Sequence, residues 1–316
     1  MALLLFLDGF CIVIEHKGRS GSVNHPSMTQ SSAIEAVGAR LRAARMGAGL
    51  TPDQLAELTG VSRAAIYRYE AGHPIRVDTL GRIADHLGVS IGSLLGVSVE
   101  YISSALTFFE RMRQIEEKAE RISVMFGPVS YLLTTDRYDA LLPTVLRESV
   151  PTDVPDHTDA LRQIDRVVEV LKQRKTTYRA RRPHVVSLVS AAEIEAFCAS
   201  GFVGTQALAG QKDRREAARA EVQNIIELLK SEPMGIQIGV LVDSMPGASF
   251  QIFRGTSLPE LAMSPFRLGA LANVRFGVAT ITSAPEAVAQ HEAITERLWR
   301  RSLKGSEAAQ YIEKLL

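Results

Sequence analysis

The residues with the clearest chemical potential lie between positions 61 and 69. Four of them are spaced so that they share one face of a helix: Arg63, Ala64, Tyr67 and Arg68. Three others supply the opposite, apolar face: Val61, Ile66 and Tyr69. An arginine guanidinium donates two parallel hydrogen bonds to O6 and N7 of guanine, and a polar, arginine-bearing helix fits a major groove about 12 Å wide. The spacing therefore predicts a helix that reads bases, which makes double-stranded DNA the first partner to consider.

The preceding residues predict a second helix packed across the first. Thr51 is a good N-cap, Pro52 fits the first helical position, and Gln54 completes a capping box. Gly60 can adopt the left-handed conformation that ends this helix, and Ser62 then caps the next one. Two packed helices without nucleic acid are the alternative, but caps, small residues and apolar positions all fit the register of a helix-turn-helix.

At about residues 34–96 the chain resembles the lambda-repressor-like, xenobiotic-response-element type of helix-turn-helix regulators. A preceding helix with Ile34, Val37, Leu41 and Ala44 and later segments between Thr79 and Leu95 extend the likeness. The resemblance implies an all-α, five-helix DNA-binding domain, placed here at residues 33–97.

The resemblance also assigns roles by position. Arg63, Ala64 and Arg68 match the base-reading face, and Tyr67 matches a position that contacts the DNA backbone or a thymine methyl. Five residues are assigned to phosphate: Thr51, Gln54, Ser62, His73 and Arg76. Pro52 stands where the family usually has Gln, and Ala71 where it often has Asn, so one side-chain phosphate contact and one backbone N–H are absent.

Composition bounds the remaining possibilities. The chain has 316 residues, 46% of them hydrophobic, which predicts two or more domains with apolar cores. Two widely separated cysteines fit a reducing cytoplasm and no disulfide framework. Between residues 38 and 96 seven arginines face five acids, so a single copy should bind DNA weakly and with strong salt dependence.

The first 32 residues are expected to be a disordered or dispensable leader, with Met28 as a possible true start. Residues 1–14 are apolar, but Asp8 and Gly9 interrupt them, and the run is too short to span a bilayer. No membrane association is expected.

Residues 98–126 are predicted to form a connector helix. Its apolar residues recur at heptad-like spacings: Ile102, Ala105, Phe109, Met112 and Ala119. The stripe fits either an amphipathic helix packed on its own domain or a helix that pairs with its copy. We favour a homodimer, with Ile102, Phe109 and Met112 at the contact, because this family gains specificity by doubling half-sites about 34 Å apart.

Residues 127–316 change to a mixed α+β (α/β) pattern typical of a sensor or effector domain. Strands are expected at 129–134, 184–190, 236–242, 250–254 and 274–281, and helices at 137–149, 160–178, 191–199, 214–230, 285–303 and 307–315. The layout weakly resembles the uncharacterised domains that follow such DNA-binding modules in bacterial regulators, and it implies a small-molecule effector or a partner.

No set of residues in this region predicts an enzyme, a cofactor or a metal. Gly201 and Gly204 lack the Lys-Ser/Thr of a phosphate loop, and His291 lacks a second histidine four residues away. The cluster of Asp153, Asp156, His157 and Asp159 fits helix capping better than a hard-metal site. Cys198 fits a buried filler better than a redox-sensing thiol.

The run from Lys172 to Arg182 holds six basic residues and no acid. It fits a solvated helix end, where cations complement the helix dipole, or a second patch for phosphate or an anionic ligand.

The sequence thus favours a cytoplasmic, nucleoid-associated, homodimeric transcriptional regulator that binds a palindromic operator. The main alternative is an antitoxin-like DNA-binding protein whose C-terminal domain binds a partner protein. An enzyme fused to a DNA-binding domain is the weaker alternative, because no catalytic motif supports it.

Overall fold

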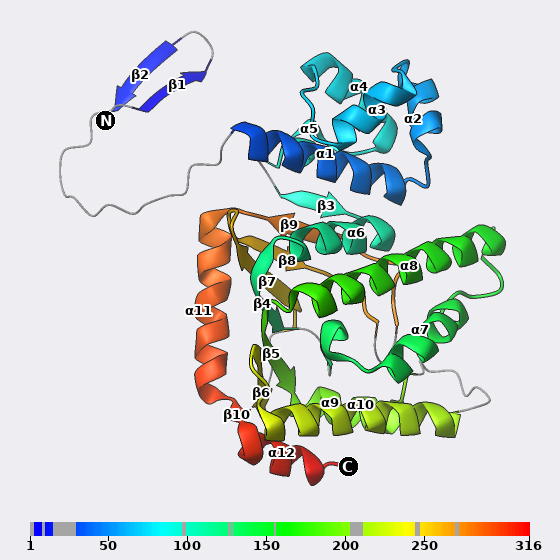
Figure 1. The fold of residues 1–316 in the computed structure, drawn as a ribbon, viewed down its shortest axis with the longest axis vertical. Helices are drawn as coiled ribbons and strands as arrows, with labels where there is room; N and C mark the ends of the chain where they lie inside the picture. Colours follow the sequence, from blue (N-terminus) through cyan, green and yellow to red (C-terminus); the bar gives the residue numbers. More distant parts are fainter. Residues whose placement is uncertain are drawn as a thin grey trace.

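The computed structural model describes residues 3–7, 10–14, 30–96, 99–125, 127, 129–154, 156–202, 211–243, 247–268 and 272–316 (Figure 1). At the start, β1 (Leu3–Leu7) pairs antiparallel with β2 (Phe10–Ile14). These strands fall in the segment expected to be a leader, and residues 15–29 of that segment, including Met28, lie outside the described residues.

Helices alone build the N-terminal region that follows. They are α1 (Gln30–Gly47), α2 (Pro52–Thr59), α3 (Arg63–Glu70), α4 (Val77–Leu87) and α5 (Ile91–Leu95). Leu41, Leu55, Ile66 and Ile83 are almost completely buried and form the centre of this region. The all-α character expected for residues 33–97 is therefore confirmed for the described residues.

A mixed sheet forms the centre of the C-terminal region. Within the described residues its eight strands lie in the order β10-β6-β5-β4-β7-β8-β9-β3. Their bounds are β3 (Glu100–Ile102), β4 (Ala119–Met125), β5 (His184–Ser190), β6 (Ile236–Leu241), β7 (Phe250–Gly255), β8 (Glu260–Met263), β9 (Ala279–Thr282) and β10 (Leu303–Lys304). Strands β4, β5 and β6 are parallel to one another, and the other neighbours pair antiparallel.

Helices cover both faces of this sheet unequally (Figure 1). On one face stands α11 (Pro285–Arg301), whose Val288 packs with Phe250 and Ile252 of β7. On the other face the larger core includes Phe253 of β7, as expected from the alternation of side chains along a strand. The helices of that core are α6 (Ala105–Glu116), α7 (Asp136–Glu148), α8 (His157–Arg181), α9 (Ala191–Ser200), α10 (Gln211–Ser231) and α12 (Gly305–Glu313). The expected α+β class is confirmed.

The prediction of a single helix for residues 98–126 was wrong. The segment folds as β3, α6 and β4, because Ser104 caps α6 by accepting a hydrogen bond from the Thr107 backbone N–H, and the helix ends at Glu116. Ile102, Phe109 and Met112 are 6%, 4% and 1% exposed and belong to the large core of one chain. The apolar stripe is therefore internal, and these residues do not offer the dimer contact assigned to them.

Smaller expectations in the C-terminal region also need correction. Residues 131–133 form a 3-10 turn instead of part of a strand. The strand expected at 274–281 is shorter and corresponds to β9. The sequence does not predict β3, β8 or β10, since each has four residues or fewer and leaves little alternation to recognise. Strand β4 lies in the segment predicted as the connector helix.

A buried ionic cluster joins the two regions. Glu100 of β3 accepts hydrogen bonds from Arg111 of α6 at 2.9 Å and from Arg40 of α1 at 2.7 Å. Burial by itself would raise the pKa of Glu100, but the charges and hydrogen bonds of Arg111 and Arg40 outweigh it and lower that pKa. The helix-turn-helix region is thus tied to α6 and β3 by charge-assisted hydrogen bonds.

Candidate nucleic-acid interface

The first helix of the motif, α2, has the caps that the sequence predicts. The Thr51 Oγ1 accepts from the Gln54 backbone N–H at 3.2 Å, and the Thr51 N–H donates to Gln54 Oε1 at 2.8 Å. At the other end Gly60 has a φ of 67°, the left-handed conformation that glycine adopts without steric cost. Capping box and C-cap are both confirmed.

The second helix, α3, is anchored through its inner face. The Ser62 Oγ accepts from the Ala65 backbone N–H at 3.2 Å, and Ile66 is fully buried against Leu41 and Leu55. The four residues assigned to base reading are all exposed: Arg63, Ala64, Tyr67 and Arg68. Both arginines therefore point away from the protein core, as a base-reading role requires.

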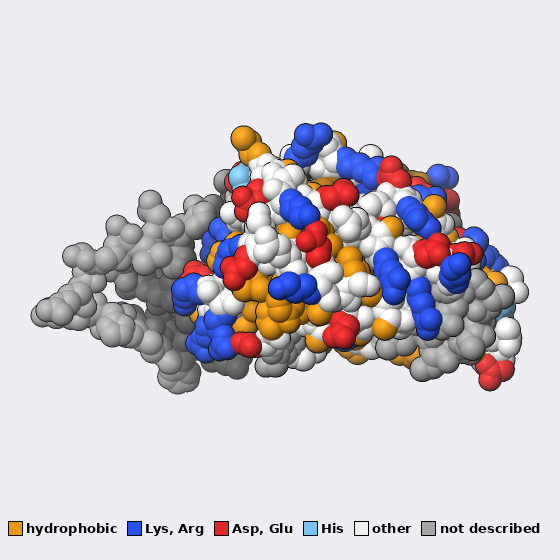
Figure 2. All heavy atoms as spheres, turned by 90° about the horizontal axis from the view of Figure 1, so that it is seen from below, with side chains coloured by type: hydrophobic (Ala, Val, Ile, Leu, Met, Phe, Trp, Pro, Cys, Tyr) orange, Lys and Arg blue, Asp and Glu red, His pale blue; other side chains and the backbone are white. Residues whose placement is uncertain are grey.

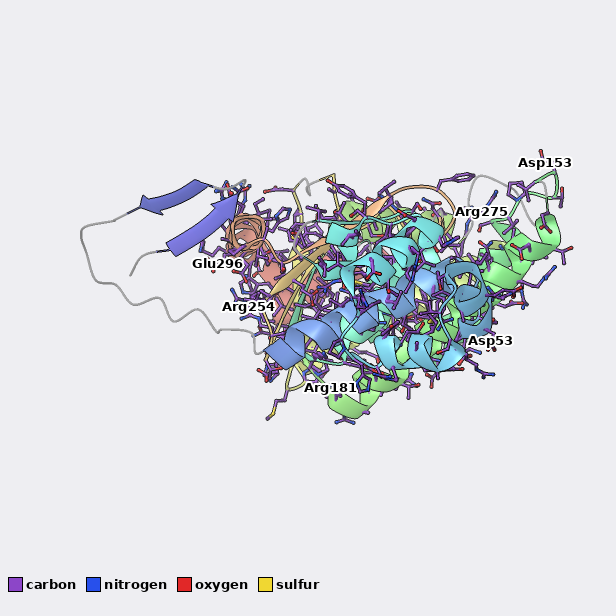
Figure 3. The ribbon with its side chains drawn as sticks, turned by 90° about the horizontal axis from the view of Figure 1, so that it is seen from above. Asp53, Asp153, Arg181, Arg254, Arg275 and Glu296 are labelled. Carbon is purple, nitrogen blue, oxygen red and sulfur yellow. The ribbon has the colours of Figure 1, made fainter. Side chains whose placement is uncertain are left out.

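Arg63 forms an exposed ion pair and a cation–π contact on the protein surface. Its Nε lies 3.1 Å from Asp53 Oδ1 of α2, and its guanidinium carbon lies 5.5 Å from the centre of the Tyr67 ring. The hydrogen bond to the Tyr67 hydroxyl, followed by the Asp53 charge, raises the pKa of Arg63, so the side chain stays cationic. An exposed ion pair of this kind contributes little stability and is readily exchanged for another anion. Figure 3 places Asp53 at the outer rim of the helical region.

The orientation of α3 depends on a buried ion pair that the sequence reading missed. Arg45 of α1 donates to both carboxylate oxygens of Glu70, the last residue of α3, and also to the Leu50 carbonyl. Both charged side chains are 10% exposed or less. Arg45 and Arg40 are two of the seven arginines between residues 38 and 96, but their charges are balanced by Glu70 and Glu100 and do not add to a positive field toward DNA.

Close contact between backbones fixes the same helix end. A Cβ at Gly38 of α1 would lie 2.4 Å from the Tyr69 carbonyl oxygen and 2.8 Å from that of Glu70. Only glycine lets the two helices approach so closely. A glycine inside an amphipathic helix is the sequence signal that could have revealed this contact.

The five residues assigned to phosphate are exposed as well: Thr51, Gln54, Ser62, His73 and Arg76. Three of them already serve as caps in which their oxygens accept backbone hydrogens. Each keeps a donor for a phosphate oxygen, namely the hydroxyl hydrogen of Thr51 and Ser62 and the amide NH2 of Gln54. Arg76 is 3.3 Å from Asp78, and its side chain is 87% exposed.

The long basic run does not form the surface patch considered for it. Arg174 is buried and donates two hydrogen bonds to Glu116, and Lys175 is buried against Asp139 at 2.7 Å. Arg179 pairs with Asp136. Lys172, Arg181 and Arg182 remain exposed, too few for a continuous phosphate track.

The other residues considered for chemistry have structural roles. Asp156 caps α8 by accepting from the Asp159 backbone N–H, and Figure 3 places Asp153 and Arg181 at opposite ends of that helix. Glu292 pairs with Arg254 at 2.6 Å. Cys198 is buried, which raises the pKa of its thiol. Gly204 lies outside the described residues, and within the described part no three His, Cys, Asp or Glu side chains gather as a metal site would require.

The face opposite the helix-turn-helix region carries charges of both signs. Figure 2 shows acidic and basic side chains intermingled over the face opposite the helix-turn-helix region. A mixed face of this kind produces no extended positive field for a polyanion. None of the helices in the described ranges has the length and apolar character needed to cross a bilayer.

Comparison with known proteins agrees with the geometry of the N-terminal region. Residues 41–94 match the helix-turn-helix family model HTH_3, which is of the xenobiotic-response-element type. No curated protein matches the chain. Among solved structures, the archaeal chromatin protein TrmBL2, reported with a novel mode of DNA binding, aligns with 87% of this chain and 100% of its own at 10% identity and a TM-score of 0.32.

Proposed function

We propose that this chain is a sequence-specific DNA-binding transcriptional regulator that acts as a homodimer in the cytoplasm, on the nucleoid, and is not an enzyme. The observation that carries the proposal is the exposed face of α3, where Arg63 and Arg68 project beside a helix start held by Ser62. Two guanidinium groups on one exposed helix face have the geometry for bidentate recognition of guanine. The helix-turn-helix match over residues 41–94 supports DNA as the partner.

We include a second copy of the chain because one helix-turn-helix unit alone would bind DNA too weakly for high specificity. One helix-turn-helix unit contacts few base pairs, and the exposed arginines in this region are Arg42, Arg63, Arg68, Arg76 and Arg82. Half-sites about 34 Å apart double the contacts and square the discrimination. Because the stripe at Ile102, Phe109 and Met112 is internal, the dimer must use a different surface. The C-terminal region then acts as the sensor of a small molecule or partner and sets the spacing of the two α3 helices.

Selection of bound sequences from a random duplex library tests base reading. Arg68→Ala should cost about 1–3 kcal/mol at the preferred site and relax the preference at one base-pair position, as expected for loss of a bidentate contact. Arg82→Ala on α4 is the matched control, because it removes an exposed arginine of the same region that has no assigned base contact. A uniform loss across all sequences would instead make Arg68 a phosphate contact, and no enriched motif for the wild-type protein would reject the proposal.

The selected motif also tests the dimer. A palindrome with half-sites one helical turn apart, together with a dimer mass in analytical ultracentrifugation, is the expected result. A single unrepeated half-site bound by a monomer would contradict it.

A further inference from the structure

The large core of the C-terminal region contains a partly open cavity of about 200 Å³. Its lining combines aromatic side chains with polar and charged ones, and it comes from α6, the segment after β4, α7, α8, α9, β7 and the segment after β8. The aromatic residues are Phe108, Phe109, Tyr131, Tyr138, Phe197 and Phe266. An apolar cavity of roughly 150 Å³ is already large enough to hold benzene, so this one has room for a single substituted ring.

Two acceptor oxygens at this cavity have no hydrogen-bond partner among the described residues. One is Oε1 of Gln251, a residue that is only 8% exposed. The other is Oε2 of Glu193, in the first turn of α9. Buried acceptors without partners are rare, because each loses its water without compensation. Among the described residues, both acceptors are therefore free to take a hydrogen bond from a bound donor.

Sheet register explains why these acceptors share one site. Gln251 of β7 pairs with Val124 near the carboxyl end of β4, and α9 starts directly after the carboxyl end of β5. Since β4 and β5 are parallel, both acceptors lie at the same edge of the sheet. In open α/β sheets this edge is where ligands bind.

Two cations, Arg174 and the exposed Arg267, line the cavity, and neither donates a hydrogen bond to these two acceptors. Arg174 lines the cavity, but it donates two hydrogen bonds to Glu116 and lies over the rings of Phe109 and Tyr131 at 5.5 and 5.7 Å. Its charge is therefore balanced within the protein. The carboxylate of Glu193 has no such counter-ion among the described residues.

We propose that this cavity binds a small aromatic amine, with the ring among the phenylalanines and tyrosines and the ammonium donating to Glu193 and Gln251. An ammonium supplies three donors and the positive charge that balances Glu193. This ligand would be the effector of the regulator, so the assignment rests on the proposed function for its biological meaning, although binding itself does not.

Helix α6 connects this cavity to the DNA-binding region. Phe108, Phe109 and Met112 form one wall of the cavity. On the same helix Arg111 pairs with Glu100, which also holds Arg40 of α1. A ligand that shifts α6 therefore acts on the helix against which the end of α3 is packed.

Calorimetry on the full chain, with benzylamine and with toluene, which lacks the amino group, as probes, tests the site. Benzylamine should bind the wild-type protein at least about tenfold more tightly than toluene. Glu193→Gln should remove most of that difference, while Glu195→Gln, an exposed position on the same helix, should leave it unchanged. Gln251→Met should weaken benzylamine without lowering the thermal stability of the free protein, because the lost oxygen has no partner. Absence of benzylamine binding, or equal binding by Glu193→Gln, would overturn the proposal.

Two measurements distinguish amine binding in the cavity from base reading by α3. The double variant Arg63→Ala/Arg68→Ala should bind benzylamine as the wild type does, so the cavity is tested even if base reading fails. For the wild-type protein, saturating benzylamine should change the affinity for the selected DNA by at least about fivefold. Binding of the amine with unchanged DNA affinity would refute its role as effector.

Discussion

Two helical glycines in the DNA-binding region should respond to alanine with opposite signs. Gly38 of α1 is buried, and an added Cβ would lie 2.4 Å from the Tyr69 carbonyl oxygen and 2.8 Å from the Gly72 nitrogen. Gly81 of α4 is half-buried, and its added Cβ would meet only the end of the Ile91 side chain, at 3.6 Å. Helix propensity favours alanine at both positions by about 1 kcal/mol.

The expected magnitudes follow from these distances. At Gly38 the clashing atoms belong to the backbone and cannot rotate away, so α3 must move outward at a cost of about 1–3 kcal/mol. Once the gain in propensity is subtracted, Gly38→Ala should lower the free energy of unfolding of this region by up to about 2 kcal/mol. Gly81→Ala has no such clash and should raise it by about 0.5–1 kcal/mol.

Amide hydrogen exchange read by mass spectrometry is the suitable assay. The single tryptophan, Trp299, lies on α11 and so reports on the C-terminal region in a fluorescence measurement. Exchange at the α3 amides should be faster in Gly38→Ala and slower or unchanged in Gly81→Ala. If Gly38→Ala protects α3 as well as the wild type does, the close approach of α1 and α3 described here is wrong.

Two further predictions concern the buried charges. Glu70→Gln should destabilise α3 by about 3 kcal/mol, because the Arg45 guanidinium loses its counter-charge. The double variant Arg45→Met/Glu70→Leu removes both charges, and its stability should return to within about 1 kcal/mol of the wild type. Denaturation followed by circular dichroism measures both variants, and a double variant no more stable than Glu70→Gln would contradict this account. The lowered pKa of Glu100 means that its stabilising contribution is present above its ordinary value of 4.5 and is lost as pH falls through the folded value. The stability difference between the wild type and Glu100→Gln should therefore shrink in acid, and a difference independent of pH would refute the assignment.

Local sequence signals were sufficient for the helix-turn-helix. The caps of Thr51 and Ser62, the left-handed Gly60 and the buried Ile66 each act within a few residues, so spacing alone determines them. The exposed face of α3 followed from the same register. The partners of Arg40 and Arg45 did not, because Glu100 and Glu70 are 60 and 25 positions away.

The prediction of a connector helix for residues 98–126 was wrong for a related reason. Apolar residues at heptad-like spacing describe a helix stripe, but the same residues also satisfy a strand, a helix and a second strand that are all buried. Periodicity does not distinguish these cases when both sides of the chain face a core. The cap at Ser104 was the local signal that α6 begins there.

This correction changes how the two regions must communicate. A free connector helix would transmit a signal by altering the pairing of two copies, whereas β3 and α6 belong to the sheet and core of the C-terminal region itself. Arg40 of α1 shares the carboxylate of Glu100 with Arg111 of α6, so the DNA-binding helices are fastened to an element that also lines the aromatic cavity. A change in that cavity then has to move only one helix to reach α1, and α1 holds the end of α3 through Gly38 and Arg45.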